Sequence, residues 1–300
     1  MLDIIGKTPM MQLERFQKRL NIDTVKLLAK LEFLNPLGSL KDRTAACMIK
    51  DAEQSGSLKP GSTIIEATNG NTGLSVAAVA AIMGYKTLFT MPETVPEQWR
   101  RLFKAYGAEI VLTDKEKGIG GAINMAKILN KQIDKSVILD QFENPANPQA
   151  HFATTGPEIW NDTDGEADVF VSAVGTGGTF SGTGGYLKMK NPKIKNIIVE
   201  PYSSPTISKG SSGEHKIHGI GCGFVPETLN INICDAVITV KDEDALEYSG
   251  IFAKTEGMLA GVSSGAVLCA AHKLSKMDTY KDKTMVLVLP DSGEKYFSEK

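Results

Sequence analysis

The sequence has little of what several classes of protein need. Among its 300 residues there are four cysteines, four histidines and two tryptophans. The cysteines form no C-x-x-C pair and are too sparse for a disulfide framework, which fits a reducing compartment. His215 and His218 lie close together in sequence, but without a second metal-like cluster they are more typical of a polar loop than of a zinc site. We therefore expect neither a disulfide scaffold nor a metal centre.

An excess of one charge and long apolar runs are also missing. The formal net charge is −2, so we expect no nucleic-acid partner and no anionic membrane partner. The N-terminal residues MLDIIG lack a basic region followed by an apolar run. The longest apolar stretch, around residues 74–83, is too short to span a bilayer. A cytoplasmic, soluble protein is the expectation.

Short β-type runs alternate with longer helical patterns, which predicts an α/β fold with buried parallel strands. The βα units form two groups, at about residues 60–140 and 165–290, so we expect two domains, each a mostly parallel twisted sheet flanked by helices. Residues 141–160, rich in Pro, Asn and Thr, form the expected passage between them. The expected strands cover residues 25–31, 63–66, 86–90, 109–112, 136–140, 168–173, 195–199, 235–240 and 284–289. The expected helices cover residues 43–54, 72–83, 97–106, 118–131, 155–160, 181–189, 243–255 and 264–273.

The segment NPLGSLKDR, residues 35–43, places a lysine in an unusual position. Pro36 and Gly38 favour a turn, Ser39 can cap a helix, and Lys41 then lies in the first helical turn. The positive end of the helix dipole disfavours an ammonium ion there. We therefore expect a lowered pKa for Lys41, and a neutral amine attacks carbonyl groups. Taken alone, an ordinary surface lysine near a helix start is the alternative.

The segment EATNGNTG, residues 66–73, follows an expected strand and opens a helix. Its short side chains and two glycines let a ligand approach the backbone, and Asn71 and Thr72 add amide and hydroxyl donors at the helix N-terminus. This arrangement suits a carboxylate. An Asn-Gly turn with a helix cap is the alternative.

The segment VGTGGTFSGTGG, residues 174–185, runs from a strand into a helix and predicts a phosphate cup of backbone N–H groups. It is not a P-loop, because no Gly-Lys-Ser/Thr follows. It is not a complete dinucleotide fingerprint either, because Phe180 stands where a glycine is needed. Glu200 nevertheless ends the next strand, as a ribose-binding acid would. A nicotinamide-dependent dehydrogenase therefore remains a rival hypothesis. A fourth segment, GVSSGAV at 261–267, places hydroxyls at a helix start, where a plain cap would also explain them.

Together these segments resemble the cysteine synthase (O-acetylserine sulfhydrylase) family of fold-type II pyridoxal phosphate (PLP) enzymes, which includes cystathionine β-synthase. The resemblance runs from IGKTPM at residues 5–10 to PDSGEKY at 290–296, with PET, YGAEIVLT, QFENPANPQAHFATTGPEIW, VEP and HKIHGIGCGFVP in between. It implies a tryptophan synthase β-like fold. It also implies a smaller mobile substrate-binding domain at 39–145 and a larger PLP-phosphate-binding domain at 1–38 plus 146–300.

The resemblance also implies site residues. Lys41 matches the catalytic lysine that holds PLP as a Schiff base. Asn71 matches the residue that binds the ring hydroxyl, and Ser263 matches the hydroxyl that faces the pyridine nitrogen. The matching phosphate cup consists of Gly175, Thr176, Gly177, Gly178 and Thr179. The matching substrate-carboxylate positions are Thr68, Asn69, Gly70, Thr72 and Gln141.

The implied activity is β-elimination and β-replacement on a small amino acid through an aminoacrylate. A serine at the ring nitrogen, in place of an aspartate, leaves that nitrogen largely unprotonated and favours this chemistry over transamination. The expected reaction joins O-acetyl-L-serine and sulfide to give L-cysteine. The first alternative is a lyase that consumes L-cysteine and releases hydrogen sulfide, with water or a thiol as acceptor. Cystathionine β-synthase activity ranks third, and a nicotinamide-dependent dehydrogenase is a remote alternative.

Three departures from the family pattern put the second substrate in doubt. Asn69 replaces the usual serine of the carboxylate loop, Trp99 lies in the segment expected to move, and Cys222 replaces a small residue next to the cofactor face. The family also implies a homodimer, and a serine acetyltransferase whose C-terminal tail docks in the active-site cleft. A non-catalytic regulator is conceivable, but an intact Lys41 and phosphate cup argue against it.

Overall fold

The computed structural model describes residues 1–296 of the chain, which divide into two compact units. The small unit comprises Met1–Ile5 and Lys41–Asn147, and the large unit comprises Gly6–Leu40 and the chain from Pro148 onward. The sequence-based domain boundaries at 39–145 and 146–300, and the mobility ascribed to the smaller domain, stay predictions. In the structure Met1–Ile5 are grouped with the small unit.

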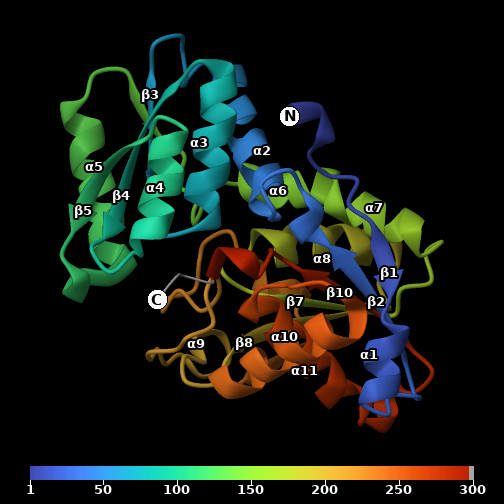
Figure 1. The fold of residues 1–300 in the computed structure, drawn as a ribbon. Coiled ribbons are helices and arrows are strands. Elements are labelled where there is room, and N and C mark those ends of the chain that lie inside the picture. The colour runs from blue at the N-terminus through green and yellow to red at the C-terminus, as the bar shows by residue number, and fades with distance from the viewer. Residues whose placement is uncertain (297–300) are drawn as a thin grey trace. The chain divides into compact units, whose positions relative to one another are not determined.

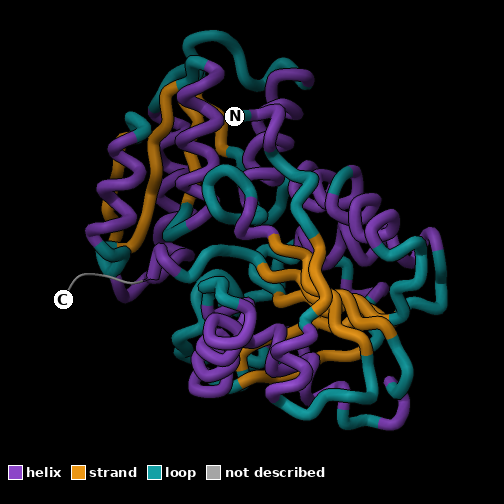
Figure 2. Tube along the Cα trace, turned by 45° about the vertical axis from the view of Figure 1, so that its right-hand side comes forward, coloured by secondary structure: helices purple, strands orange, loops and turns teal. Residues whose placement is uncertain are grey.

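The small unit is built on a four-stranded parallel sheet in the order β5-β4-β3-β6. Helix α5 covers one face, and α3 and α4 lie on the other (Figures 1 and 2). Its strands are β3 (Thr63–Ala67), β4 (Lys86–Pro92), β5 (Glu109–Thr113) and β6 (Ser136–Ile138), and its helices are α2 (Lys41–Gln54), α3 (Asn71–Met83), α4 (Glu97–Ala105) and α5 (Gly118–Gln132).

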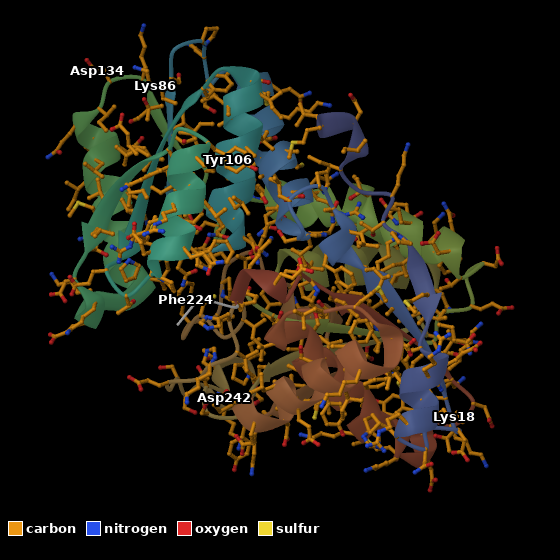
Figure 3. All side chains as sticks on the ribbon, in the orientation of Figure 1. Lys18, Lys86, Tyr106, Asp134, Phe224 and Asp242 are labelled. Carbon is orange, nitrogen blue, oxygen red and sulfur yellow. The ribbon has the colours of Figure 1, made fainter. Side chains whose placement is uncertain are left out.

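The two ends of this sheet differ in what they carry. Figure 3 labels Lys86 and Asp134 at the amino end, where β4 begins and the chain approaches β6. The loops that follow β3 and β6 leave the opposite, carboxyl end. Ligands of parallel α/β sheets bind beyond the carboxyl ends of the strands, so this second end is where the small unit holds its candidate site residues.

The large unit is built on a six-stranded sheet in the order β1-β2-β10-β7-β8-β9, in which only the β1–β2 pair is antiparallel. Its strands are β1 (Met10–Gln12), β2 (Lys26–Leu31), β7 (Val169–Ala173), β8 (Lys195–Pro201), β9 (Ala236–Val240) and β10 (Thr284–Leu289). Its helices are α1 (Glu14–Arg19), α7 (Thr155–Asp162), α8 (Gly178–Lys190), α9 (Thr206–Lys209), α10 (Asp242–Glu256) and α11 (Val262–Ser275), and α6 (Ala146–Ala153) enters it from residue 148 on. Short 3-10 helices in the described chain are Leu2–Ile4, Glu32–Leu34, Lys115–Lys117, Ile231–Ile233, Asp278–Tyr280 and Glu294–Tyr296.

Strand β10 shows why both faces of the large sheet are covered. Met285 and Leu287 pack in the core that includes α10 and α11, while Val286 and Val288 pack with residues of α7 and α8 on the other face. Side chains alternate between the two faces of a strand, so a run of apolar residues needs a helical layer on each side. Fully burying one such side chain stabilises the fold by about 1.5–3 kcal/mol. The predicted α/β class with parallel sheets flanked by helices is confirmed.

The differences from the predicted elements are local. The edge strand β1 and helices α1, α6 and α9 were not predicted, and three helices begin two or three residues earlier than expected, at Lys41, Gly178 and Val262. These starts lie at Gly- and Ser-rich turns, where the apolar repeat that reveals a helix has not yet begun. Within residues 1–296, no helix combines the length and the hydropathy that crossing a bilayer requires.

Candidate active site

Lys41 is the first residue of α2, and the loop before it is tied to the end of β10. The backbone N–H of Leu40 donates to the carbonyl of Pro290 (2.9 Å), and Ser39 forms a β-bridge with Asp291. Gly38 adopts a left-handed conformation (φ +71°), and Lys295 Nζ donates to its carbonyl oxygen at 3.2 Å. The residue before Lys41 is therefore anchored at the carboxyl edge of the large sheet.

Within the small unit, the starts of α2 and α3 are joined by a buried hydrogen bond. Ser75 Oγ donates to Asp42 Oδ1 at 2.6 Å, and both residues are fully buried. The two helices pack side by side (Figure 1). Lys41 and Asn71, each the first residue of its helix, consequently lie at neighbouring helix N-termini, which are favourable positions for anionic groups.

The predicted carboxylate loop connects β3 to α3 and is ordered by Thr68 and Thr72. Thr68 Oγ1 accepts from the N–H of Gly73 at 2.9 Å, and a Cβ on Gly73 would come within 2.6 Å of the Thr68 methyl group. Thr72 Oγ1 donates to Gln141 Oε1 at 2.5 Å. The structure therefore brings Thr72 and Gln141 together, while Asn69 lies exposed at the tip of the loop.

Glu66 received no role from the sequence, yet it is the buried anchor of this region. It is the next-to-last residue of β3, and its carboxylate accepts hydrogen bonds from the N–H groups of Asp140 (2.9 Å) and Gln141 (3.2 Å). Burial, opposed by these two hydrogen bonds, raises the pKa of Glu66 to about 8. The available signal was a glutamate inside an otherwise apolar strand, immediately before the glycine-containing loop.

The predicted phosphate cup lies between β7 and α8, and only glycine fits its first turns. A Cβ on Gly175 would lie 2.2 Å from the carbonyl oxygen of Gly219. Gly177 has a φ of +87°, and a Cβ there would lie 2.8 Å from that of Leu229. Because the first four N–H groups of a helix have no partner within it, the start of α8 at Gly178 offers donors to an anionic group.

The side chains around the cup were partly missed by sequence reasoning. Thr179 Oγ1 lies 3.2 Å from His151 Nε2, whose other ring nitrogen lies 2.9 Å from Thr155 Oγ1. His151 is fully buried. Thr228 Oγ1 donates to the carbonyl of Thr176. These contacts hold the side chain of Thr179 and the backbone of Thr176, and no spacing pattern in the sequence indicates them.

Ser263 lies at the start of α11, on the same edge of the large sheet. Gly261, which precedes the helix, donates its N–H to the carbonyl of Asp291 (2.9 Å), just beyond β10, and β10 is the neighbour of β7. Ser263 is 3% exposed, and its hydroxyl forms no hydrogen bond within residues 1–296. A hydroxyl can both donate and accept a hydrogen bond, so this one suits a ligand nitrogen.

Cys222 and the two loop histidines lie beside the cup. Cys222 Sγ contacts the carbonyl oxygen of Gly175 at 3.4 Å, which places the thiol next to the predicted cofactor loop. His215 Nε2 pairs with the carbonyl of Gly221 (2.9 Å), and the His218 ring stacks on Tyr296 at 5.3 Å. Across residues 1–296, no group of three His, Cys, Asp or Glu side chains is arranged to hold a metal ion. Phe224, labelled in Figure 3, belongs to the same loop.

The expectation that Glu200 resembles a ribose-binding acid is wrong. This buried carboxylate accepts from the N–H groups of Ile207 (2.8 Å) and Ser208 (3.1 Å) and from the hydroxyl of Ser208 (2.5 Å). Its acceptor oxygens are therefore used to hold the turn into α9. The feature that favoured a nicotinamide cofactor is a structural cap, and the dehydrogenase hypothesis loses its support.

The residues of each unit, taken separately, fit PLP. In the large unit the glycine loop provides an N–H cradle that side chains would fill, and Ser263 provides a hydroxyl for a ring nitrogen. In the small unit Lys41 provides an amine at a helix start. The chain matches the family model of pyridoxal-phosphate dependent enzymes over residues 1–291. It belongs to this family, and PLP is its cofactor.

The similar proteins narrow the class to the cysteine synthase group. A cysteine synthase of Staphylococcus aureus is 48% identical over 296 residues, covering 98% of this chain and 94% of its own. The cysteine synthase structure from Entamoeba histolytica superposes with a TM-score of 0.94 at 38% identity, covering 100% of this chain and 91% of that one. A hydrogen sulfide-producing enzyme of Fusobacterium nucleatum superposes with a TM-score of 0.93 at 40% identity, covering 99% and 97%. The resemblance inferred from the motifs is confirmed.

Replacing Gly177 by alanine should weaken PLP retention. The left-handed φ disfavours any Cβ by roughly 1–2 kcal/mol, and the new methyl group would also press on Leu229. We expect the purified G177A protein to hold less PLP, measured by cofactor absorbance against protein concentration at increasing dilution. Gly210 is the matched control, because its φ is also positive (+66°) and no atom lies within 4 Å of an added Cβ. Equal PLP retention in G177A and the wild type would contradict the assignment of the cup.

Proposed function

We propose that this enzyme forms L-cysteine from O-acetyl-L-serine and sulfide by β-replacement. The observation that carries the proposal is Ser263, a serine at the edge of the large sheet that also carries the glycine loop, whose hydroxyl forms no hydrogen bond within residues 1–296. A neutral hydroxyl facing the ring nitrogen does not supply the charge that stabilises long-lived carbanions, so loss of the β-substituent is favoured over transamination. Similarity to proteins named cysteine synthase supports the choice of substrates.

Each predicted residue has one task in this proposal. When bound, PLP supplies an electron-withdrawing ring that acidifies the α-carbon of the amino acid. Lys41 would hold the cofactor, and its amine would also take the α-proton at Nζ once substrate is bound. Asn71 binds the ring hydroxyl, and the cup of Gly175, Thr176, Gly177, Gly178 and Thr179 binds the phosphate.

The loop at 68–72, with Gln141, binds the substrate carboxylate. Thr68 keeps the loop folded through the N–H of Gly73, and Thr72 and Gln141 hold each other through a 2.5 Å hydrogen bond. Asn69, which is exposed, and Gly70, which is half-buried, form the turn between them. A loop with these constraints is preorganised, which lowers the entropic cost of binding the anion. Binding that brings the loop onto the substrate would also exclude water from the reacting carbon.

A cysteine-consuming, hydrogen sulfide-releasing reaction is the second candidate. The specific observation in its favour is Asn69, whose larger, polar side chain is exposed at the loop tip where the family pattern has serine. An amide there can hydrogen-bond water or a thiol near the reacting carbon. A structural neighbour at 40% identity is itself a hydrogen sulfide-producing enzyme.

We further propose that the enzyme is a cytoplasmic homodimer and that the C-terminal tail of a serine acetyltransferase can bind at its active site. The family resemblance supports both proposals, and within residues 1–296 the cysteines are all free thiols. Light scattering of the purified protein measures whether it is a dimer. Titration with a synthetic peptide of the tail measures whether the tail binds.

The product distribution tests the proposed reaction. O-acetyl-L-serine with sulfide should give L-cysteine and acetate at a kcat/KM at least tenfold above that for sulfide release from L-cysteine alone. Mass spectrometry of the amino acid and a sulfide electrode measure both reactions on one enzyme preparation. Faster sulfide release from cysteine than cysteine formation would instead establish the second candidate.

Lys41→Ala should abolish turnover while leaving the fold intact. Losing a positioned proton acceptor costs roughly 10²–10⁴-fold in rate, and the covalent hold on the cofactor is lost as well. After borohydride reduction and digestion, the wild type should carry the cofactor mass on the peptide containing Lys41. Lys50→Ala, an exposed site on the same helix α2, is the control and should keep wild-type activity. Near-normal turnover of K41A would rule out the assigned role.

Asn69→Ser should raise the ratio of cysteine formation to sulfide release. Removing the amide removes donors and an acceptor beside the loop tip, where a water or thiol acceptor would bind. We expect a change in the ratio of about 3- to 10-fold, the range that one hydrogen bond contributes. Asn161→Ser, at an exposed position of α7, controls for a general effect. A ratio equal to that of the wild type would remove Asn69 from the specificity argument.

A further inference from the structure

We propose that Glu66 is a positioning residue that sets the substrate-carboxylate loop by holding the backbone of residues 140–141, and through it the side chain of Gln141. The inference rests on the proposed function, in which Gln141 contributes to carboxylate binding. Glu66 itself lies under the loop rather than in it.

The geometry forms a closed chain of contacts. The two oxygens of Glu66 accept separately, Oε2 from the N–H of Asp140 (2.9 Å) and Oε1 from that of Gln141 (3.2 Å). The Gln141 side chain then donates through Nε2 to the carbonyl of Ala67 (3.2 Å) and accepts through Oε1 from Thr72 (2.5 Å). Ala67 follows Glu66 directly, so the contacts lead from the end of β3 through residue 141 and back into the loop.

The backbone that Glu66 holds is one that would not keep its conformation unaided. Asp140 has a φ of +52°, a left-handed conformation that costs a residue with a side chain roughly 1–2 kcal/mol. Asn147 Nδ2 supports the same turn from the other side by donating to the carbonyl of Gln141 (2.8 Å). The N–H and the C=O of Gln141 are therefore both held by buried side chains. This fixes the backbone position from which the Gln141 side chain extends.

The role is geometric rather than electrostatic. Glu66 is 1% exposed and forms no ion pair within residues 1–296. Burial raises the pKa of its carboxyl to about 8, with the nearby Asp140 adding to the shift and the N–H groups of 140 and 141 opposing it. Burial disfavours the charged carboxylate and the two N–H groups favour it, so what the group contributes to the loop is the position of its two acceptor oxygens.

Glu66→Gln is the decisive variant because it keeps the shape of the side chain and replaces one of its two acceptor oxygens by an NH2 group. The amide retains one acceptor oxygen but turns an NH2 group toward one of the two backbone donors, so one hydrogen bond is lost. We expect KM for the amino-acid substrate to rise about 3- to 10-fold with kcat changed less than about twofold, and PLP absorbance unchanged. Steady-state kinetics at pH 7, cofactor absorbance and a thermal melt give the three measurements.

Glu200→Gln is the matched control. Glu200 is equally buried, ends a strand of the large unit and also accepts from two successive backbone N–H groups. E200Q should lose a comparable amount of thermal stability with KM within about twofold of the wild type. A KM increase in E200Q equal to that in E66Q would show that lost stability alone explains the effect, and would overturn the proposal.

A double-mutant cycle with Gln141→Ala separates this inference from the function on which it rests. If Glu66 acts through Gln141, the double variant E66Q/Q141A should have the same KM as Q141A, because coupled residues are not additive. The positioning role would be overturned if the KM increases of E66Q and Q141A multiplied in the double variant. It would also be overturned if E66Q left KM unchanged while Q141A raised it. An unchanged KM in Q141A would instead contradict the proposed carboxylate site. Should E66Q fail to fold, Asn147→Ala removes the hydrogen bond that Asn147 donates to the carbonyl of Gln141. This variant should raise KM in the same way.

Discussion

The passage of the chain between β7 and α8 is the constraint on which the rest of the site depends. Gly175 lies so close to the carbonyl of Gly219 that a side chain has no room, and Gly177 turns the chain with a φ that other residues avoid. This close passage leads directly into the start of α8 at Gly178, whose first N–H groups have no partner within the helix. The loop that contacts it, from Gly219 to Leu229, carries Cys222 and Thr228, so a change in the turn would displace the thiol and the threonine that flank the cofactor region.

The two units offer different kinds of hydrogen-bond donor to the anions that they are proposed to bind. The large unit relies mainly on backbone N–H groups, which cost no rotamer entropy, with Thr176 and Thr179 beside them. The small unit uses side chains, and each of them must be held. Gln141 is fixed by Thr72, Ala67, Asn147 and Glu66, all through hydrogen bonds shorter than about 3.3 Å. A phosphate that stays bound suits a rigid cradle, whereas a substrate that enters and leaves suits a loop whose order depends on a few polar contacts.

The sequence predicted the class of fold and most strands, because apolar β-type runs at residues 63–66 or 284–289 are unambiguous when helical patterns separate them. It did not predict β1, a three-residue edge strand with no apolar repeat, or the packing of α6. The motif loops were placed correctly on strand ends and helix starts. What lay beyond sequence reasoning was tertiary: Glu66 meets residues 140 and 141, 74 positions along the chain, and His151 meets Thr179, 28 positions away. For Glu200 the sequence predicted a ligand contact that the structure does not support, because its carboxylate accepts from backbone N–H groups of the loop that follows β8.

The choice between making and consuming cysteine depends on a different part of the molecule from the one that defines the family. In the proposed function the glycine loop, Ser263 and Lys41 take part in both reactions, because each reaction removes a β-substituent from the amino acid. The two reactions differ in the leaving group, acetate or sulfide, and in the nucleophile that replaces it. The proposal assigns this choice to Asn69 at the tip of the carboxylate loop in the small unit, while Cys222 lies beside the glycine loop in the large unit. A binding difference of 1.4 kcal/mol, about one good hydrogen bond, changes a rate ratio tenfold. Family membership therefore establishes the cofactor chemistry, while the proposal requires only a difference of this size, such as the amide of Asn69, to change the product.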